Sequence, residues 1–274
     1  HAGNMLPFQE FFIIPTGASC FSEAMQIGCE TFHILKETIK NKYSGDATLI
    51  GDEGGFAPPC DVSTALDLLS ESIHKSGYTS EIELGLDVAA SEFKVDGHDE
   101  SVYDLNFKGR EQKLMCGDEM VNYYKNLIED YKIISIEDPF DQDDWENWSK
   151  LVTSVDGKCQ IVGDDLTVTN KIRISKAVKQ NAANCLLLKV NQIGTITEAI
   201  DSVNYSYSKD WNIMASHRSG ETEDTYLADL SVGLSTRQIK TGAQCRGERT
   251  AKYNQLLRIE EELGSYGKYA GKII

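Results

Sequence analysis

Six apolar runs in this sequence each end in a polar or charged residue, and their spacing constrains the fold more than any other feature. The six residues are Asp87, Glu137, Asp164, Lys189, His217 and Lys240. The steps between them are 50, 27, 25, 28 and 23 residues, and each step after the first is about the length of one strand and one helix. The pattern predicts a repeated βα unit in a (β/α)8 barrel of the α/β class, where the C-terminal ends of the strands carry the chemistry.

The length of the chain agrees with that architecture. The chain has 274 residues, and a barrel of eight βα units typically has ~250. Hydrophobic residues make up 41% and charged residues 26% of the chain, which is typical of a globular protein. We therefore predict one domain over residues 1–274.

Net charge, apolar stretches and cysteine content argue against several classes of protein. A formal net charge of -16 disfavours nucleic acid as a partner, because phosphate contacts require clustered lysine and arginine. No stretch of 18 uncharged apolar residues predicts a membrane span, and no signal-peptide pattern opens the sequence. The seven cysteines are odd in number and scattered, which indicates reduced thiols. We expect a cytoplasmic protein.

Strands and helices alternate along most of the chain. The expected strands are at residues 10–15, 82–90, 132–140, 160–166, 184–192, 212–220 and 237–243. Apolar residues at helical spacing predict helices around 21–39, 66–73, 120–131, 145–152 and 256–263. Residues 51–59, GDEGGFAPP, predict a shaped loop, and a turn at 96–101 predicts a hairpin that explains the long first step.

The strand count is one short of a closed barrel. The expected strands number seven, whereas this architecture needs eight. We therefore expect that an element before His1 is missing and that the chain is truncated at its N-terminus.

Three acids from different strands form the first candidate site. A single acid after a strand is usually a turn residue or a helix cap. If Asp87, Glu137 and Asp164 converge, however, carboxylates ~4 Å apart repel by roughly 4 kcal/mol per pair at an effective dielectric of 20, so they need a cation or protons. A ligand set made only of oxygen atoms suits Mg²⁺, whereas zinc would require histidine or cysteine.

Lys189 follows a strongly apolar run, which is unusual for a lysine. One interpretation is a structural salt bridge to one of the acids. The other is a general base, whose pKa must lie well below the usual ~10.4. Burial near a second cation could lower it, and Lys240 is a candidate for that cation, although alone it would be an ordinary surface lysine.

The remaining candidates lie in loops and at the ends of strands. His217, Arg218, Ser219 and Gly220 form a polar cluster that suits a phosphate or carboxylate, although such clusters also occur as plain turns. Glu53 lies between glycines in a loop that could cover a pocket, and by itself it would be an acidic surface turn. Glu10 begins the first expected strand.

Nine motifs together resemble one family. They are HAGN at 1–4, QEF at 9–11, GDEGGFAP at 51–58, LDVAASEF at 86–93, SIEDPFDQDDW at 135–145, GDDLTVTN at 163–170, LLLKVNQIG at 186–194, SHRSGETEDT at 216–225 and QIKTGA at 238–243. They resemble the C-terminal barrel domain of the enolases, the glycolytic phosphopyruvate hydratases, and the resemblance runs essentially from end to end. It implies a Mg²⁺-dependent lyase that converts 2-phosphoglycerate to phosphoenolpyruvate and water, reversibly, in glycolysis and gluconeogenesis.

The resemblance also implies a role for each candidate residue. Asp87, Glu137 and Asp164 match the ligands of the first Mg²⁺, and Lys189 matches the base that removes the α-proton. Glu53 matches the acid that protonates the departing hydroxyl group, with Glu10 beside it. The expected substrate-binding residues are His1, Glu10, His217, Arg218, Ser219 and Lys240. The family's N-terminal domain and first barrel strand have no counterpart in this sequence, which leaves the second Mg²⁺ site incomplete, and the resemblance implies a homodimer.

Two alternatives remain open at the level of the sequence. The first is a catalytically inactive enolase fragment that serves as a structural or surface binding protein, although its candidate site residues are all present. The second is a racemase or cycloisomerase of the wider superfamily, which the phosphate-type cluster at 217–220 disfavours.

Overall fold

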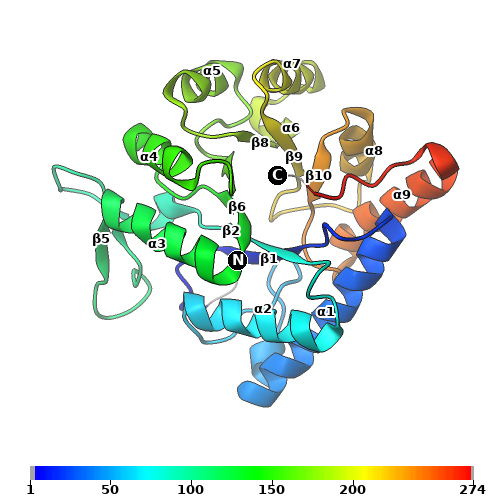
Figure 1. The fold of residues 1–274 in the computed structure, drawn as a ribbon, viewed down its shortest axis with the longest axis horizontal. Helices are drawn as coiled ribbons and strands as arrows, with labels where there is room; N and C mark the ends of the chain where they lie inside the picture. Colours follow the sequence, from blue (N-terminus) through cyan, green and yellow to red (C-terminus); the bar gives the residue numbers. More distant parts are fainter. Residues whose placement is uncertain (1–3, 273–274) are drawn as a thin grey trace. The chain divides into compact units, whose positions relative to one another are not determined.

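A computed structural model gives the fold of the chain and describes residues 4–272 (Figure 1). The helices are α1 (Phe21–Lys42), α2 (Val62–Ser76), α3 (Gly117–Tyr131), α4 (Trp145–Val155), α5 (Lys171–Gln180), α6 (Val190–Ile193), α7 (Ile196–Tyr207), α8 (Tyr226–Gly233) and α9 (Gly247–Leu263). The strands are β1 (Glu10–Ile14), β2 (Glu83–Asp87), β3 (Lys94–Val95), β4 (Val102–Asp104), β5 (Leu114–Cys116), β6 (Ile133–Glu137), β7 (Gln160–Gly163), β8 (Cys185–Leu188), β9 (Asn212–Ser216) and β10 (Arg237–Lys240).

The larger sheet contains the seven strands that the sequence predicts. Within the described residues its order is β1-β2-β6-β7-β8-β9-β10, so each strand lies beside the strand of the next βα unit. Strands β2, β6, β7 and β8 pair in parallel. The α/β class with a strand order that follows the chain is therefore confirmed.

The chain divides into two compact units. Among the described residues, the first comprises residue 4 and residues 13–83 and 214–272, and the second comprises residues 5–12 and 84–213. One domain over residues 1–274 stays a prediction.

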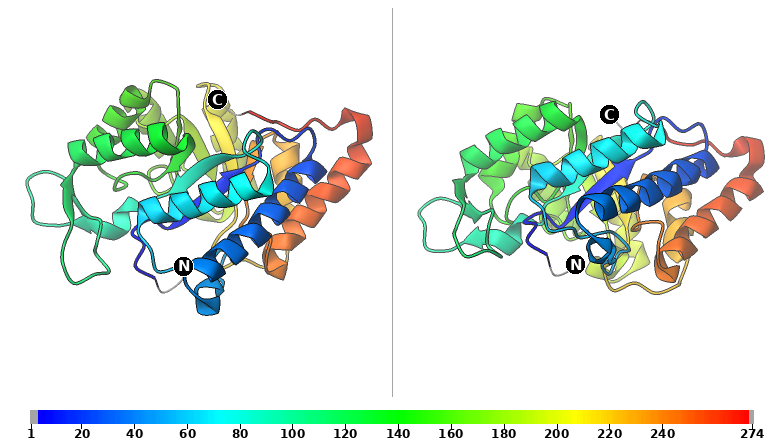
Figure 2. Two further views of the ribbon diagram at one scale, coloured as in Figure 1. Left: turned by 60° about the horizontal axis from the view of Figure 1, so that its bottom comes forward. Right: turned by 90° about the horizontal axis from the view of Figure 1, so that it is seen from below.

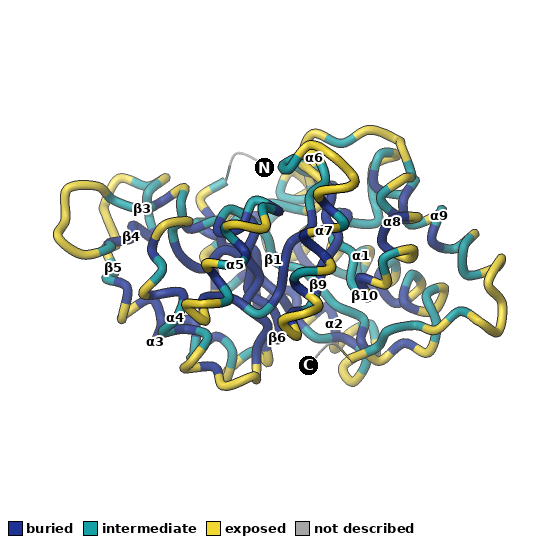
Figure 3. Tube along the Cα trace, turned by 90° about the horizontal axis from the view of Figure 1, so that it is seen from above, coloured by how far each residue is buried: buried dark blue, intermediate teal, exposed yellow. Residues whose placement is uncertain are grey.

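Parallel strands and an outer row of helices make up most of the second unit. Helix α3 packs on β6 and α4, α4 contacts α5, α5 contacts α7, and α7 contacts β8. Strand β6 is buried along its whole length (Figure 3), and so are β7 and β8, as expected for apolar strands covered by helices. These covered strands position the residues at their C-terminal ends.

A small antiparallel sheet is inserted in the second unit between β2 and α3. Its order is β3-β4-β5, and Val95 pairs with Val102 across the predicted turn. The sequence predicts the first two strands but not β5, because LMC at 114–116 is too short to show a period of two. The insertion accounts for the 50-residue step between Asp87 and Glu137.

Helices pack side by side in the first unit. Helix α1 contacts both α2 and α9, and α9 contacts α8 (Figure 2). Local chemistry fixes the ends of α2: the Asp61 carboxylate accepts a hydrogen bond from the Thr64 N–H at 2.9 Å, and Gly77 ends the helix with a φ of 81°. No helix in residues 4–272 combines the length and the apolar character needed to cross a membrane.

Candidate active site

The predicted acids of the second unit lie at the ends of neighbouring strands. Asp87 is the last residue of β2 and Glu137 the last residue of β6, and the two are paired in register. Asp164 follows β7 directly. All three are buried, with exposed fractions of 4%, 1% and 7%. Acids so deeply buried require compensation by protons, donors or a cation.

The strand register indicates that these acids share one face of the sheet. Glu137 pairs with Val162, and Asp164 stands two residues beyond Val162. Because side chains alternate between the faces of a strand, residues two apart lie on the same face, and residues paired in register do so as well. The predicted trio therefore projects from one face of the sheet in the second unit.

Asp138 is a fourth buried acid, which sequence reasoning missed. Its carboxylate accepts hydrogen bonds from the backbone N–H of Asp164 at 2.9 Å and of Asp165 at 2.8 Å. The carboxylate oxygens of Asp138, Asp164 and Asp165 approach within 4.8 Å of one another. Burial, together with the charges of Asp164 and Asp165, raises the pKa of Asp138 well above its usual value. Asp138 thus holds the turn that carries Asp164.

Lys189 follows β8 and directly precedes the four-residue helix α6. Its ammonium forms an ion pair with Asp164 Oδ2, while Gln192 Nε2 donates to Asp164 Oδ1 at 2.8 Å. The Lys189 backbone N–H donates to Thr169 Oγ1 at 3.0 Å. The predicted salt bridge between Lys189 and an acid is therefore confirmed. The role of Lys189 as a general base stays a prediction.

The chemistry of this cluster fits a hard divalent cation. The buried carboxylates of Asp87, Glu137 and Asp164 offer only oxygen atoms on one face, and carboxylate oxygens of Asp138 and Asp165 lie within 4.8 Å of Asp164. Magnesium prefers oxygen ligands and leaves coordination positions open for substrate oxygens and water. The residues present thus suit Mg²⁺ better than zinc.

Glu53 lies in the predicted loop of the first unit, and glycine geometry shapes that loop. Gly54 has a φ of 80°, and a Cβ at this position would lie 2.8 Å from the carbonyl oxygen of Cys245. The Ala243 N–H donates to the Glu53 carbonyl oxygen at 2.9 Å. These constraints fix the backbone beneath a side chain that is 14% exposed.

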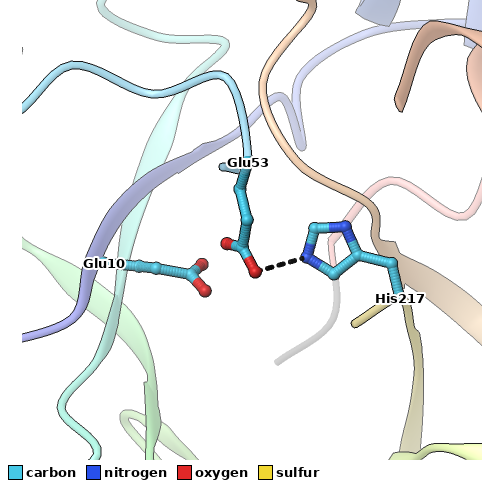
Figure 4. Close-up of side chains that lie close together, drawn as sticks. All are labelled: Glu10, Glu53 and His217. Atoms are coloured by element: carbon cyan, nitrogen blue, oxygen red, sulfur yellow. Dashed lines mark ion pairs between the residues drawn. The ribbon is translucent and has the colours of Figure 1, made fainter. Parts of the chain in front are cut away.

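His217 follows β9 and is paired with Glu53. Its Nε2 atom faces the Glu53 carboxylate (Figure 4) and lies 3.3 Å from Oε1, and the His217 side chain is 2% exposed. The His217 backbone N–H donates to the carbonyl oxygen of Lys240, the last residue of β10, at 3.0 Å. The first unit therefore brings His217 close to Glu53, the predicted acid, and to the backbone of Lys240, a predicted substrate-binding residue.

Two buried cations on helix α9 hold the segment after β9, and sequence reasoning missed both. Arg249 and Lys252 are each 0% exposed. Arg249 donates to His217 Nδ1 and to backbone carbonyl oxygens, while Lys252 donates to the Thr222 carbonyl oxygen and pairs with Glu221. Their only signal in the sequence was their place on an amphipathic helix, where charge normally indicates an exposed face.

The other predicted residues are placed as follows. Arg218 is exposed, and Ser219, Lys240 and Glu10 are partly buried. Glu10 begins β1, as expected. His1 lies outside the described residues. Arg218 and Ser219 present their backbone carbonyl oxygens to Arg249.

Comparisons with known proteins agree with the motifs. A family described as "Enolase, C-terminal TIM barrel domain" matches residues 1–274. The protein "Enolase 2" of Hevea brasiliensis and the protein "Enolase" of Solanum lycopersicum are each 58% identical to the chain over 275 aligned positions. Each alignment covers 99% of this chain and 61% of the relative, so the chain spans less than two thirds of their length.

Proposed function

We propose that this chain, which belongs to the enolase family as its C-terminal TIM barrel domain, carries the catalytic groups for the reversible, Mg²⁺-dependent dehydration of 2-phosphoglycerate to phosphoenolpyruvate. The observation that carries the proposal is the set of three buried acids on one face of the second unit, with Lys189 paired to Asp164. Membership of the family at 58% identity supports it.

In this proposal the residues of the second unit remove a proton. Asp87, Glu137 and Asp164 would hold Mg²⁺, which when bound supplies positive charge for the substrate carboxylate as the α-proton leaves. Lys189 accepts that proton, so its amine must be neutral and released from Asp164 at that moment. Thr169 and Gln192 keep Lys189 and Asp164 in place before the step.

The residues of the first unit act on the leaving group and on substrate binding. Glu53 gives a proton to the departing hydroxyl group, which leaves as water while the double bond forms. Arg218 and Ser219 suit the phosphate group, and Lys240 suits the carboxylate. The proposed β-elimination takes one proton from the substrate and gives one proton to the departing hydroxyl group.

An assay that separates the two protons tests the assignment. Production of phosphoenolpyruvate is followed by its absorbance at millimolar Mg²⁺, and exchange of the substrate α-proton with deuterated water is followed by NMR. Lys189→Ala should lower both rates by about 10²- to 10⁴-fold, because both require the base. Glu53→Gln should lower the dehydration rate while exchange of the α-proton continues.

This test has a matched control variant and two outcomes that would contradict the proposal. Lys158→Ala changes an exposed lysine of the same unit and should leave both rates unchanged. If the unsubstituted chain binds 2-phosphoglycerate but shows no rate above background, the chain has no activity on its own, and a binding role replaces the enzymatic one. If Lys189→Ala keeps full exchange, Lys189 is not the base.

A further inference from the structure

The guanidinium of Arg249 joins two segments that the proposed function treats separately. Its side chain is completely buried in the first unit. One nitrogen, Nη1, lies 2.6 Å from His217 Nδ1 and 2.7 Å from the Arg218 carbonyl oxygen. The other, Nη2, lies 3.0 Å from the Asp52 carbonyl oxygen and 2.7 Å from the Ser219 carbonyl oxygen. One side chain thus holds the loop before Glu53 and the segment after β9.

The contact with His217 determines which ring nitrogen carries the proton. A guanidinium has donors and no acceptor, so His217 Nδ1 must be the acceptor in this contact and cannot carry a hydrogen. A neutral imidazole then carries its proton on Nε2. This is the nitrogen that lies 3.3 Å from Glu53 Oε1.

We propose that Arg249 is a positioning residue that holds His217 as the Nε2–H tautomer, so that the ring turns its proton-bearing edge toward the Glu53 carboxylate. Calling that carboxylate the acid of the reaction rests on the proposed function, whereas the tautomer does not. The same guanidinium holds the carbonyl of Asp52, so the position of Glu53 and the state of His217 depend on one residue.

Glycine at position 242 supports a positioning role because it brings Arg249 close to the Glu53 loop. Gly242 has a φ of 90°, and a Cβ there would lie 2.8 Å from the Cδ atom of Arg249 and 2.9 Å from the Glu53 carbonyl oxygen. The stem of Arg249 is therefore confined between the end of β10 and the Glu53 loop. A side chain packed in this way holds its head group in one geometry.

The test is NMR of ¹⁵N-labelled histidine in the full chain, which contains five histidines. The resonances of His217 are identified by their loss in His217→Asn. We expect a pyridine-type shift for Nδ1 and a pyrrole-type shift for Nε2 in the unsubstituted chain. A proton on Nδ1 of His217 in the unsubstituted chain would by itself overturn the proposal.

Substitutions of Arg249 test whether this residue determines the tautomer of His217. Arg249→Met should move the Nδ1 resonance and allow the Nδ1–H form to arise, because the carbonyl oxygens that Arg249 leaves can accept that proton. Arg249→Lys keeps a cationic donor and should retain Nδ1 as an acceptor. It provides a second test if Arg249→Met does not fold. Arg258→Met makes the same change at an exposed arginine of α9 and should leave the His217 spectrum unchanged.

Activity separates this inference from the proposed function. If the enzyme is active, Arg249→Lys should lower the dehydration rate more than the exchange of the α-proton, because Glu53 acts after that proton has left. Unchanged His217 resonances in both Arg249 variants would refute the positioning role. If the expected tautomer is found in a chain without activity, only the proposed function fails.

Discussion

Replacing Lys252 by methionine should destabilise the first unit, because Lys252 holds the segment that follows β9. Its ammonium pairs with Glu221, donates to the Thr222 carbonyl oxygen and donates to the Glu248 carbonyl oxygen at 2.8 Å. The side chain is 1% exposed, while that of Glu221 is 19% exposed. Methionine has a stem of similar length, so the change removes the charge and the donors and leaves little cavity.

The size of the effect follows from what remains after the substitution. Removing one partner of a buried ion pair typically costs about 3–5 kcal/mol, because the other charge stays buried. Glu221 retains some exposure and can recover part of its hydration, so we expect a loss of about 3 kcal/mol in the free energy of unfolding. Lys252→Met combined with Glu221→Gln should regain part of that loss, because no unpaired charge is left behind.

Urea denaturation at neutral pH measures the free energy of unfolding of Lys252→Met and of the double variant. Arg258→Met, which changes an exposed cation of the same helix, is the control. A free energy of unfolding within about 0.5 kcal/mol of the unsubstituted chain, as for an ordinary surface change, would show that Lys252 does not hold the loop. A double variant less stable than Lys252→Met alone would show that Glu221 is not its partner.

Three further predictions concern other parts of the fold. Tyr103→Phe should cost about 2 kcal/mol in urea denaturation, because the buried hydroxyl donates to the Asp144 carboxylate at 2.6 Å; equal stability would contradict this. Gly54→Ala should lower the melting temperature, since a left-handed residue with a side chain costs about 1–2 kcal/mol and the new Cβ would also contact Cys245; an unchanged melting curve would mean that the loop adapts. Burial raises the pKa of Tyr269 from 10.0 to about 12, so its contribution to stability is present below pH 10 and is lost as the pH rises through 12. Tyr269→Phe should therefore show a smaller fall in stability between pH 10 and 12, and an identical fall would refute the assignment.

The sequence predicted the strand ends because two independent signals coincide there. Apolar runs mark covered parallel strands, and the first polar residue after each run marks the end that faces the chemistry. Asp87, Glu137 and His217 are found at the ends of β2, β6 and β9, as expected. These positions depend on local composition and repeat length, which a single sequence contains.

The supporting residues could not be predicted because their roles depend on partners far away in the sequence. Asp138 follows Glu137 and looks like part of the same acidic pair, yet it binds backbone groups 26 and 27 residues further along the chain. Arg249 looks like one charge on an amphipathic helix, yet it contacts the carbonyl oxygen of Asp52, 197 residues away. Only the folded chain shows that both are buried.

The ion pair between Lys189 and Asp164 connects the two interpretations of Lys189 that the sequence left open. A lysine held as an ammonium by Asp164 cannot accept a proton. Lys189 therefore cannot be the ion-pair partner of Asp164 and a neutral base at the same moment. A divalent cation that bound Asp164 would compete with the ammonium for that carboxylate and would repel it. In the proposed reaction Asp87, Glu137 and Asp164 would hold the cation, and Lys189 would have to leave Asp164 and lose one proton before it could act as the base.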